Sequence, residues 1–264
     1  MNRLLLIVLI GVFSTVLLAQ AASPSSDTNP DKARADRLQA RLTDFPALAR
    51  YREANAKLVP PAKGENRVVF FGDSITDSWK LDSYFPGLPY INRGISGQST
   101  YHMLLRFRAD VINLQPKVVV VLAGTNDISS TTEQDKMATI ESNITSMVDL
   151  AHANGINVVI ASVTPVSDYN KDASGRPIIR TALRPPGQIN ELNTFIRQLC
   201  VKRGLVYLDY FSSMANDKGL LKEDIGKDGL HPNDKGYAVM RPLVETAINA
   251  ALQTKQAPRK LHLR

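Results

Sequence analysis

The sequence has little cysteine: Cys200 is the only one among 264 residues. A single cysteine cannot form a disulfide within one chain, so we expect a buried core to stabilise the fold. No cysteine stands directly after the N-terminal apolar run at residues 4–18, which argues against a lipid-anchored N-terminus. We find no internal repeat, and the length suits one α/β domain.

The formal net charge of +7 is concentrated near the two ends of the chain. Residues 253–264 form a basic tail with four Lys and Arg residues and no Asp or Glu, and residues 31–63 add a net +4. Residues 64–254 carry a net charge of only −1. This near neutrality gives no support for a nucleic-acid partner. We read the tail as a solvated end, with weak attraction to an anionic envelope surface as the alternative.

The N-terminus has the pattern of a secretory signal. The apolar run at residues 4–18 follows Asn2 and Arg3 and precedes Ala-Gln-Ala at 19–21, a small-x-small cleavage pattern. We therefore predict that residues 1–21 are a signal peptide, that the protein is exported to the periplasm or the extracellular space, and that no stable membrane span remains after cleavage. The alternative is an uncleaved anchor, although the run is shorter than the roughly 20 residues that span a bilayer.

We interpret residues 22–66 as a linker followed by N-terminal helices. The Ser-, Pro- and Asp-containing stretch 23–30 is typical of a linker. Residues 31–58 carry apolar side chains at helical spacing that is broken near Pro46, which predicts two short helices. We expect these helices to contribute packing and no chemistry.

From residue 67 onward, short β-rich runs alternate with helical patterns, which predicts a parallel sheet covered on both faces. The predicted strands are residues 67–71, 90–92, 118–122, 158–161 and 206–208. Helical spacing predicts helices around 137–151, 192–199 and 239–247. Thr132 and Asp135 would cap the first, Gly155 would end it, and Pro242 must kink or split the last.

Two residues have the setting of a serine hydrolase site. Ser74 follows the buried run 68–71, so it should lie on a strand-to-helix turn at the open edge of the sheet. Among four histidines, His152 lies within a helical pattern and His262 in the basic tail, whereas His231 lies in a loop three residues after Asp228. One turn can then present an imidazole and a carboxylate together.

Four short blocks occur in a fixed order: Gly-Asp-Ser-Ile-Thr at 72–76, Gly-Ile-Ser-Gly at 94–97, Gly-Thr-Asn-Asp at 124–127 and Asp-Gly-Leu-His-Pro at 228–232. The set resembles the SGNH/GDSL hydrolase superfamily, whose four letters fall on Ser74, Gly97, Asn126 and His231. Ile75 stands where the family's name has Leu, a departure that resembles platelet-activating-factor acetylhydrolase subunits and bacterial sugar acetylesterases. The resemblance implies a three-layer α/β/α sandwich with a five-stranded, mostly parallel flavodoxin-like sheet, here over residues 67–252.

The resemblance also implies roles for site residues. Asp228 matches the family's Asp-x-x-His pattern, whereas the residues alone also allow Asp224 or Asp234 to reach the same loop. The oxyanion donors would be the Ser74 and Gly97 N–H groups and the Asn126 amide. Gly94, in the same block as Gly97, is the competing glycine. In the family, the aspartate at the position of Asp73 supports the local backbone and is not the base.

Four further residues are candidates for substrate contact. Residues 164–187 form a long segment without strong periodicity, which is uncommon unless functional, and it contains Tyr169 and Arg180. Trp79 and Tyr101 lie close in sequence to Ser74 and Gly97 and could stack on a sugar ring, although either could as easily be core packing. The arginines of segment 164–187 could recognise acidic sugars or phosphate groups, and a solvated surface loop is an equally simple interpretation.

We therefore predict a secreted serine esterase that forms an acyl-serine intermediate, needs no metal or organic cofactor, and removes short acyl groups, most simply acetyl, from small-molecule or polysaccharide esters. The alternative is a lysophospholipase or thioesterase that acts on longer acyl chains. A carbohydrate-binding module without catalysis would lack one of Ser74, Asp228 or His231. A metal-dependent enzyme or a phosphatase could use four residues as ligands: Asp73, Asp77, Asp228 and His231. However, Ile75 stands where an Asp-x-Asp motif needs its second carboxylate. The sequence does not indicate an oligomeric state.

Overall fold

A computed structural model describes residues 30–130 and 136–254. The predicted signal peptide, most of the predicted linker, the two predicted capping residues Thr132 and Asp135, and residues 255–264 of the basic tail lie outside the described residues. The chain divides into two units, residues 1–42 and 43–264. Helix α1 (Pro30–Thr43) is the described part of the first unit. Within the described residues, no helix is long and apolar enough to cross a membrane.

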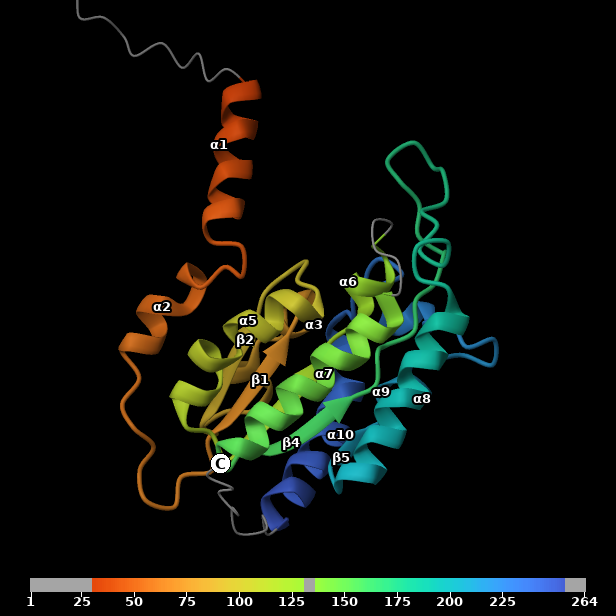
Figure 1. Cartoon of the computed structure of the whole chain (residues 1–264). Coiled ribbons are helices and arrows are strands. Elements are labelled where there is room, and N and C mark those ends of the chain that lie inside the picture. Colours follow the sequence, from red (N-terminus) through yellow and green to blue (C-terminus); the bar gives the residue numbers. More distant parts are fainter. Residues whose placement is uncertain (1–29, 131–135, 255–264) are drawn as a thin grey trace, which may run out of the picture. The chain divides into compact units, whose positions relative to one another are not determined.

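The second unit is built on a five-stranded sheet in which every pair is parallel (Figure 1). The strands lie in the order β2-β1-β3-β4-β5. Their bounds are Val68–Gly72 (β1), Tyr90–Gly94 (β2), Val118–Leu122 (β3), Asn157–Ala161 (β4) and Val206–Leu208 (β5). This confirms the predicted sheet, and the order is that of flavodoxin-like proteins, in which ligands bind outside the carboxyl ends of the strands where the order reverses, between β1 and β3.

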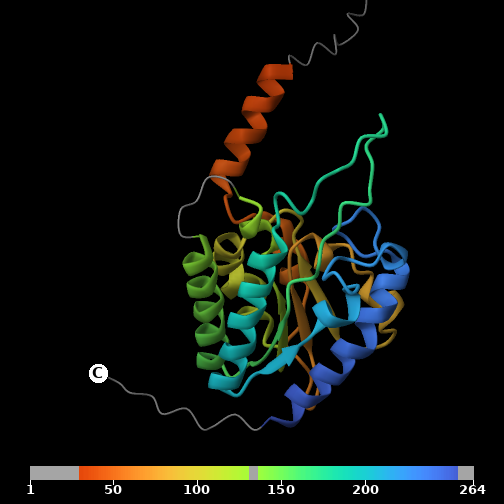
Figure 2. The same cartoon turned by 90° about the vertical axis from the view of Figure 1, so that its right-hand side faces the viewer.

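Helices cover both faces of this sheet (Figure 2). One layer comprises α5 (Thr100–Asp110), α7 (Lys136–Ala153) and α8 (Pro186–Arg203). The other comprises α3 (Ser74–Asp77), α4 (Leu81–Tyr84), α9 (Tyr210–Met214) and α10 (Asp234–Gln253). Shorter helices are α2 (Ala49–Ala56), α6 (Thr125–Ile128), η1 (Ile112–Leu114) and η2 (Glu223–Ile225). The three-layer α/β/α architecture is thus confirmed.

The apolar strand residues alternate between two cores. Val69 and Phe71 of β1 pack with α5, α7 and α8, whereas Val68 and Phe70 pack with α10 and the short helices on its side. All four side chains are at most 2% exposed. Burial of such a side chain contributes about 1.5–3 kcal/mol, so these cores hold the sheet edge rigidly.

The last helix is not split at its proline. Pro242 lies inside α10, which runs as one helix from Asp234 to Gln253. Met240 and Val244 on either side of the proline are fully buried against the sheet. This packing offsets the backbone hydrogen bond that proline cannot donate. The two helices predicted before the sheet are present as α1 and α2.

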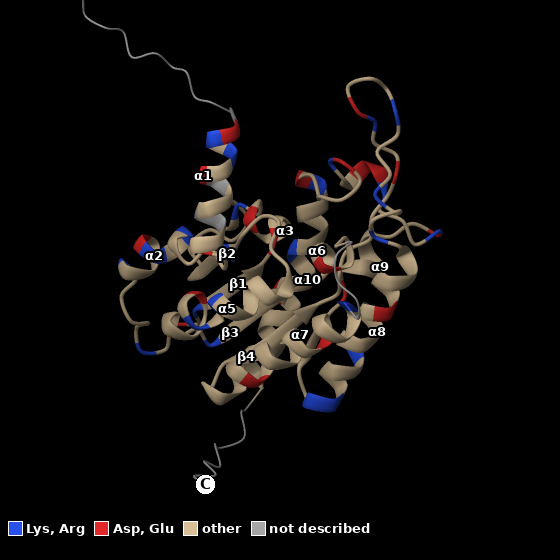
Figure 3. Cartoon of the chain, turned by 45° about the horizontal axis from the view of Figure 1, so that its top comes forward, with Lys and Arg blue, Asp and Glu red and all other residues tan. Residues whose placement is uncertain are grey.

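Charged residues lie mainly on helices and loops, where acidic and basic ones are interspersed, whereas the central strands carry almost none (Figure 3). Each predicted chemical block follows the carboxyl end of a strand or, for residues 228–232, precedes α10. The fold therefore brings the four blocks to the edge where this architecture binds ligands.

Candidate active site

Ser74 begins the short helix α3 directly after the buried strand β1. Asp73 caps this helix, because its Oδ1 accepts a hydrogen bond of 2.9 Å from the Ile75 N–H. Position 72 has room only for glycine, because neighbouring atoms approach its backbone closely. A Cβ there would lie 2.8 Å from the Leu122 carbonyl oxygen and 2.2 Å from Thr76 Oγ1. The Gly-Asp-Ser order thus gives a tight, capped turn that holds the serine side chain at the sheet edge.

The three predicted catalytic residues form one chain of contacts. Ser74 Oγ lies 2.9 Å from His231 Nε2, and His231 Nδ1 lies 2.9 Å from Asp228 Oδ2. Each side chain is partly buried. An imidazole that donates through Nδ1 to a carboxylate can accept a proton from the serine through Nε2.

Asp228 also shapes the loop that carries His231. Its Oδ1 accepts the backbone N–H groups of His231 at 2.8 Å and Leu230 at 3.1 Å. Burial alone would raise the pKa of Asp228, but the hydrogen bonds from the His231 backbone and ring outweigh it and the pKa is lowered. The carboxylate thus stays ionised at neutral pH. The structure brings Asp228 to the ring, whereas Asp224 lies in η2 and Asp234 at the start of α10.

Asp73 has a different environment from Asp228. Its side chain is 1% exposed, and no hydrogen bond reaches its Oδ2 within the described part of the chain. Desolvation raises the pKa of Asp73 to about 6, although the Ile75 N–H and His231 act in the opposite direction. Asp73 therefore caps α3, whereas Asp228 is the aspartate that contacts the His231 ring.

The predicted oxyanion donors flank the same cavity as Ser74. Gly97 has a φ of +79°, a conformation that favours glycine. Asn126, in the first turn of α6, donates through Nδ2 to the Gln98 carbonyl at 3.0 Å. An amide NH₂ group has two N–H donors, so one remains for a substrate oxygen. Gly94, the competing glycine, ends β2, where a Cβ would lie 2.1 Å from the Asp77 nitrogen.

Two arginines of the segment 164–187 contact the machinery. Arg180 Nη2 lies 3.3 Å from Asp228 Oδ2, and its Nε donates to the Asp228 carbonyl at 3.3 Å. Arg184 is 7% exposed and donates to Asn126 Oδ1 at 3.3 Å and to Thr125 Oγ1 at 3.1 Å. Burial lowers the pKa of Arg184, as does the nearby Arg180. With Oδ1 engaged, the Asn126 amide group is oriented by protein contacts on both of its ends.

The cavity above Ser74 has a volume of about 840 Å³. Besides the residues already named, its lining includes the apolar side chains of Leu230 and Pro232, the Tyr237 ring and six polar or charged residues: Ser78, Lys80, Ser96, Lys227, Asn233 and Asp234. Apart from Asp234, which was an alternative to Asp228, sequence reasoning assigned no role to these residues. Lys227 directly precedes Asp228, so adjacency to the His231 loop was the one available signal. The polar residues of this mixed lining can form hydrogen bonds with the hydroxyl groups of a substrate.

The candidates for substrate contact do not line this cavity. Trp79 is 3% exposed, and its ring packs against those of Tyr237 at 5.2 Å and Phe70 at 5.6 Å. The predicted stacking of Trp79 on a sugar is therefore wrong, because the core covers its ring. Tyr101 is half-buried and stacks on Phe45, with ring centroids 5.7 Å apart.

Tyr169 and Arg180 instead support the loop that carries His231. The Tyr169 hydroxyl accepts the Gly229 N–H at 3.1 Å, and Arg180 contacts Asp228 as described above. Within the described residues, no group of three or more His, Cys, Asp or Glu side chains is arranged to hold a metal ion. The carboxylates considered as ligands have other partners: Asp77, for example, accepts the Ser96 N–H at 3.1 Å.

Comparison with known proteins agrees with this geometry. The model of the GDSL-like lipase/acylhydrolase family matches residues 70–239. The solved structure of a GDSL-like lipase from Bacteroides thetaiotaomicron is 38% identical, with a TM-score of 0.70 over 78% of this chain and 99% of that one. An acetylxylan esterase from Geobacillus stearothermophilus, at 18% identity, shares the fold, with a TM-score of 0.55 over 72% of this chain and 95% of that one.

Curated relatives include the bovine platelet-activating factor acetylhydrolase IB subunit alpha1, 29% identical over 212 residues, which cover 74% of this chain and 81% of that one. Another relative is an uncharacterized lipoprotein from Bacillus subtilis, which is 28% identical over 41% of this chain. That match spans 52% of the lipoprotein, about half of its length. The match spans 43% of the rat alpha1 subunit. The family predicted from the four sequence blocks is confirmed: the chain belongs to the GDSL-like lipase/acylhydrolase family.

Proposed function

We propose that this protein is a serine ester hydrolase in which Ser74 is the nucleophile, His231 the general base and Asp228 the residue that orients His231. The observation that carries the proposal is the pair of 2.9 Å contacts that link Ser74 Oγ to His231 and His231 to Asp228 beside a cavity of about 840 Å³. Membership of the acylhydrolase family supports the same reaction class.

The first half-reaction acylates the serine. Ser74 Oγ attacks the ester carbonyl carbon while His231 Nε2 takes the hydroxyl proton. The oxyanion that forms would be held by the N–H groups of Ser74 and Gly97 and by the Asn126 amide. His231 then gives the proton to the leaving alcohol as the tetrahedral intermediate collapses to the acyl-serine. Loss of one oxyanion donor costs about 10²–10³-fold in turnover.

The second half-reaction regenerates the enzyme. His231 takes a proton from a water molecule, and the resulting hydroxide attacks the acyl-serine carbonyl. Collapse of the second tetrahedral intermediate returns the proton to Ser74 Oγ and releases the acyl group as a carboxylic acid. Every proton transfer uses His231 Nε2, because the carboxylate of Asp228 engages Nδ1 throughout. The cycle needs no group from outside the chain except water.

The substrate class that we propose is a short acyl ester, such as acetyl, on a carbohydrate. The polar and charged lining of the cavity, including Lys80, Lys227 and Asn233, offers donors and acceptors to hydroxyl groups. Leu230, Pro232 and the Tyr237 ring also line the cavity and offer an apolar surface to the acyl group. The acetylhydrolase named among the relatives supports the short acyl group.

We also propose that residues 1–21 direct export, that residues 22–66 precede the hydrolase domain, and that this domain spans 67–252. The apolar run and the Ala-Gln-Ala sequence support export, as does the kinship with a lipoprotein.

Hydrolysis of p-nitrophenyl esters from acetate to palmitate by the full chain tests the reaction and the acyl length. We expect the rate to fall beyond butyrate and to vanish in Ser74→Ala. A preference for octanoate or longer esters would instead favour a lysophospholipase or thioesterase. Binding of carbohydrate without hydrolysis of any ester would favour a binding protein.

A further inference from the structure

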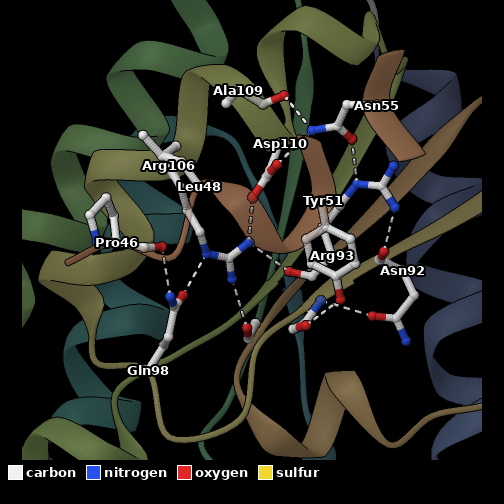
Figure 4. A network of polar contacts seen from close by, with 12 residues as sticks. Pro46, Leu48, Tyr51, Asn55, Asn92, Arg93, Gln98, Arg106, Ala109 and Asp110 are labelled. Carbon is white, nitrogen blue, oxygen red and sulfur yellow. Dashed lines mark hydrogen bonds and ion pairs between the residues drawn. The ribbon is translucent and has the colours of Figure 1, made fainter. Parts of the chain in front are cut away.

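The segment 44–55 lies before the part of the chain that the family model matches, yet it contacts the loop that carries Gly97. We call residues 94–98 the oxyanion loop and residues 44–55 the brace (Figure 4). The Tyr51 hydroxyl donates to the Gly94 carbonyl, and Gln98 Nε2 donates to the Pro46 carbonyl at 2.9 Å. The brace thus holds both ends of the oxyanion loop.

A third contact reaches the middle of the oxyanion loop. Arg50 Nη2 lies 3.6 Å from Asp77 Oδ1. The other oxygen of Asp77 accepts the Ser96 N–H at 3.1 Å and the Ser96 hydroxyl at 2.6 Å. The residues immediately before and after Gly97 are therefore fixed, directly or through Asp77, by the brace.

Gly97 itself is exposed and has open space on the side where a Cβ would lie. A Cβ placed on Gly97 would meet no heavy atom within 4 Å outside the adjoining residues. Its position consequently depends on how its neighbours in the oxyanion loop are held. An oxyanion donor must lie about 2.7–3.1 Å from the developing charge, so small displacements of this loop change its effect on turnover.

The brace is a locally ordered piece of structure. The Asp44 carboxylate accepts the N–H groups of Leu48 and Ala49, both at 2.7 Å, and so fixes the start of α2. Ala47 has a φ of +57°, a conformation that is unfavourable for an L-residue and persists where the surroundings hold it. This turn directs the Pro46 carbonyl to Gln98.

A buried polar network continues from the brace towards the nucleophile (Figure 4). Asn55 accepts from Arg93 Nε at 2.9 Å and donates to Asp110 at 2.7 Å. Asp110 pairs with Arg106 at 3.1 Å, and Arg106 is fully buried. Arg106 in turn donates to the side chain of Gln98 and, at 3.0 Å, to the carbonyl of Gly72. The network therefore ties the oxyanion loop to the turn that begins two residues before Ser74.

We propose that the brace is an intramolecular support for the oxyanion hole and that Tyr51 is a positioning residue for the Gly97 N–H. The proposal rests on the proposed function of Ser74 and Gly97. Burial and the nearby Asp77 raise the pKa of Tyr51, so its hydroxyl keeps the proton that it donates.

The test compares Tyr51→Phe with Tyr207→Phe in the full chain. Tyr207 lies on β5, the opposite edge strand from β2, and its hydroxyl accepts from Arg197 at 3.5 Å. With p-nitrophenyl acetate, we expect kcat to fall about tenfold in Tyr51→Phe with little change in KM, because a small misplacement of a catalytic group can cost up to about 10²-fold. Tyr207→Phe should retain the kcat of the unsubstituted chain.

Two further readouts separate positioning from stability. The fraction of sites that react with a fluorophosphonate should stay unchanged in Tyr51→Phe, whereas the inhibition constant of an alkylboronic acid, whose adduct occupies the oxyanion hole, should rise by about the same factor as kcat falls. A kcat loss explained entirely by a smaller reactive fraction would overturn the positioning role. If Tyr51→Phe does not fold, the exposed Arg50→Ala serves instead, with the exposed Arg52→Ala on the same helix as its control.

For Arg50→Ala we expect about a twofold to threefold fall in kcat that high salt reproduces in the unsubstituted chain, because an exposed ion pair is weak and screened by salt. If Tyr51→Phe does not fold, equal kcat values for Arg50→Ala and Arg52→Ala would overturn the proposed role of the brace. Failure of the proposed function gives a different result, namely no Ser74-dependent hydrolysis by the unsubstituted chain, which would overturn the positioning role as well. An active, Ser74-dependent enzyme whose kcat is the same in Tyr51→Phe overturns the brace alone.

Discussion

Arg180 Nη2 lies 3.3 Å from Asp228 Oδ2, the same carboxylate oxygen that faces the ring of His231 at 2.9 Å. Arg180 of the long segment 164–187 therefore holds the Asp228 side chain, in addition to the contacts within the loop of Asp228 itself. The two side chains are about a quarter exposed, so this ion pair adds little to stability. We infer that its main effect is to orient Asp228.

Replacement of Arg180 should therefore change turnover more than stability or substrate affinity. In Arg180→Met we expect kcat to fall about fivefold, KM to change little, and the free energy of unfolding to drop by less than about 1 kcal/mol. Arg176→Met is the matched control, because Arg176 is an exposed arginine of the same segment that pairs with Asp172. A rise in KM without a change in kcat would show instead that Arg180 binds substrate, as the sequence suggested.

Gly94 and Gly97 should respond differently to alanine. A Cβ at Gly94 would lie 2.1 Å from the Asp77 nitrogen, so Gly94→Ala should lower the free energy of unfolding by more than about 3 kcal/mol. Gly97 has open space around it and a φ of +79°, so Gly97→Ala should cost only about 1–2 kcal/mol but reduce kcat at least tenfold. Urea unfolding and turnover of p-nitrophenyl acetate measure both effects. Alanine keeps the backbone N–H, so the expected fall in kcat comes from strain that shifts this turn, and a fully active Gly97→Ala would contradict that sensitivity to displacement.

Asp73 should make stability depend on pH. Its pKa is raised from 3.8 to about 6, mainly by desolvation, so the folded chain binds this proton more tightly than the unfolded chain does. The free energy of unfolding should consequently fall as the pH rises from about 4 to about 6, by at most about 3 kcal/mol from this group. Asp73→Asn removes the titration, and urea unfolding at several pH values should show a smaller fall than in the unsubstituted chain.

Asp172→Asn is the control of opposite sign. Hydrogen bonds from Ser174 and the Arg176 backbone lower the pKa of the exposed Asp172. Ionised Asp172 therefore stabilises the fold above its ordinary pKa, and that contribution is lost as the pH falls. If Asp73→Asn and the unsubstituted chain have the same pH dependence, the Asp73 carboxyl does not titrate as stated.

Trp79 should matter for stability and not for substrate binding. It is 3% exposed and packs against several aromatic rings, so Trp79→Ala should lower the free energy of unfolding by about 3–5 kcal/mol. The KM of the folded variant for an acetylated sugar should match that of the unsubstituted chain. A higher KM in a variant of normal stability would restore the predicted sugar contact.

The sequence predicted the parts of this protein that depend on local patterns. Apolar runs such as residues 118–122 predict strands because both faces of a parallel sheet are covered. Gly72 and Gly94 are informative because the backbone leaves no room for a side chain there. The strands and the relative placement of Ser74 and His231 followed from these signals and from the family resemblance.

The missed features depend on contacts between distant segments. Helix α5 was not predicted, because the fully buried Arg106 interrupts its apolar face. Asp110 of the same helix neutralises its charge, and its other hydrogen bonds reach oxygens of β1, β2 and the oxyanion loop. Trp79 was ambiguous because an aromatic ring suits a core and a sugar site equally. The helices before the sheet were expected only to pack, since nothing in the local pattern of Tyr51 indicates that its hydroxyl reaches the Gly94 carbonyl.

The most direct test of the account is to trap the acyl-enzyme. The full chain is mixed with p-nitrophenyl acetate, quenched with acid during turnover, digested and examined by mass spectrometry, with Ser74→Ala treated in parallel. We predict one acetyl group on the peptide that contains Ser74 and none on the corresponding peptide of the inactive variant. Hydrolysis that persists in Ser74→Ala, or an acetyl group on a different residue required for turnover, would contradict the central claim that Ser74 is the nucleophile.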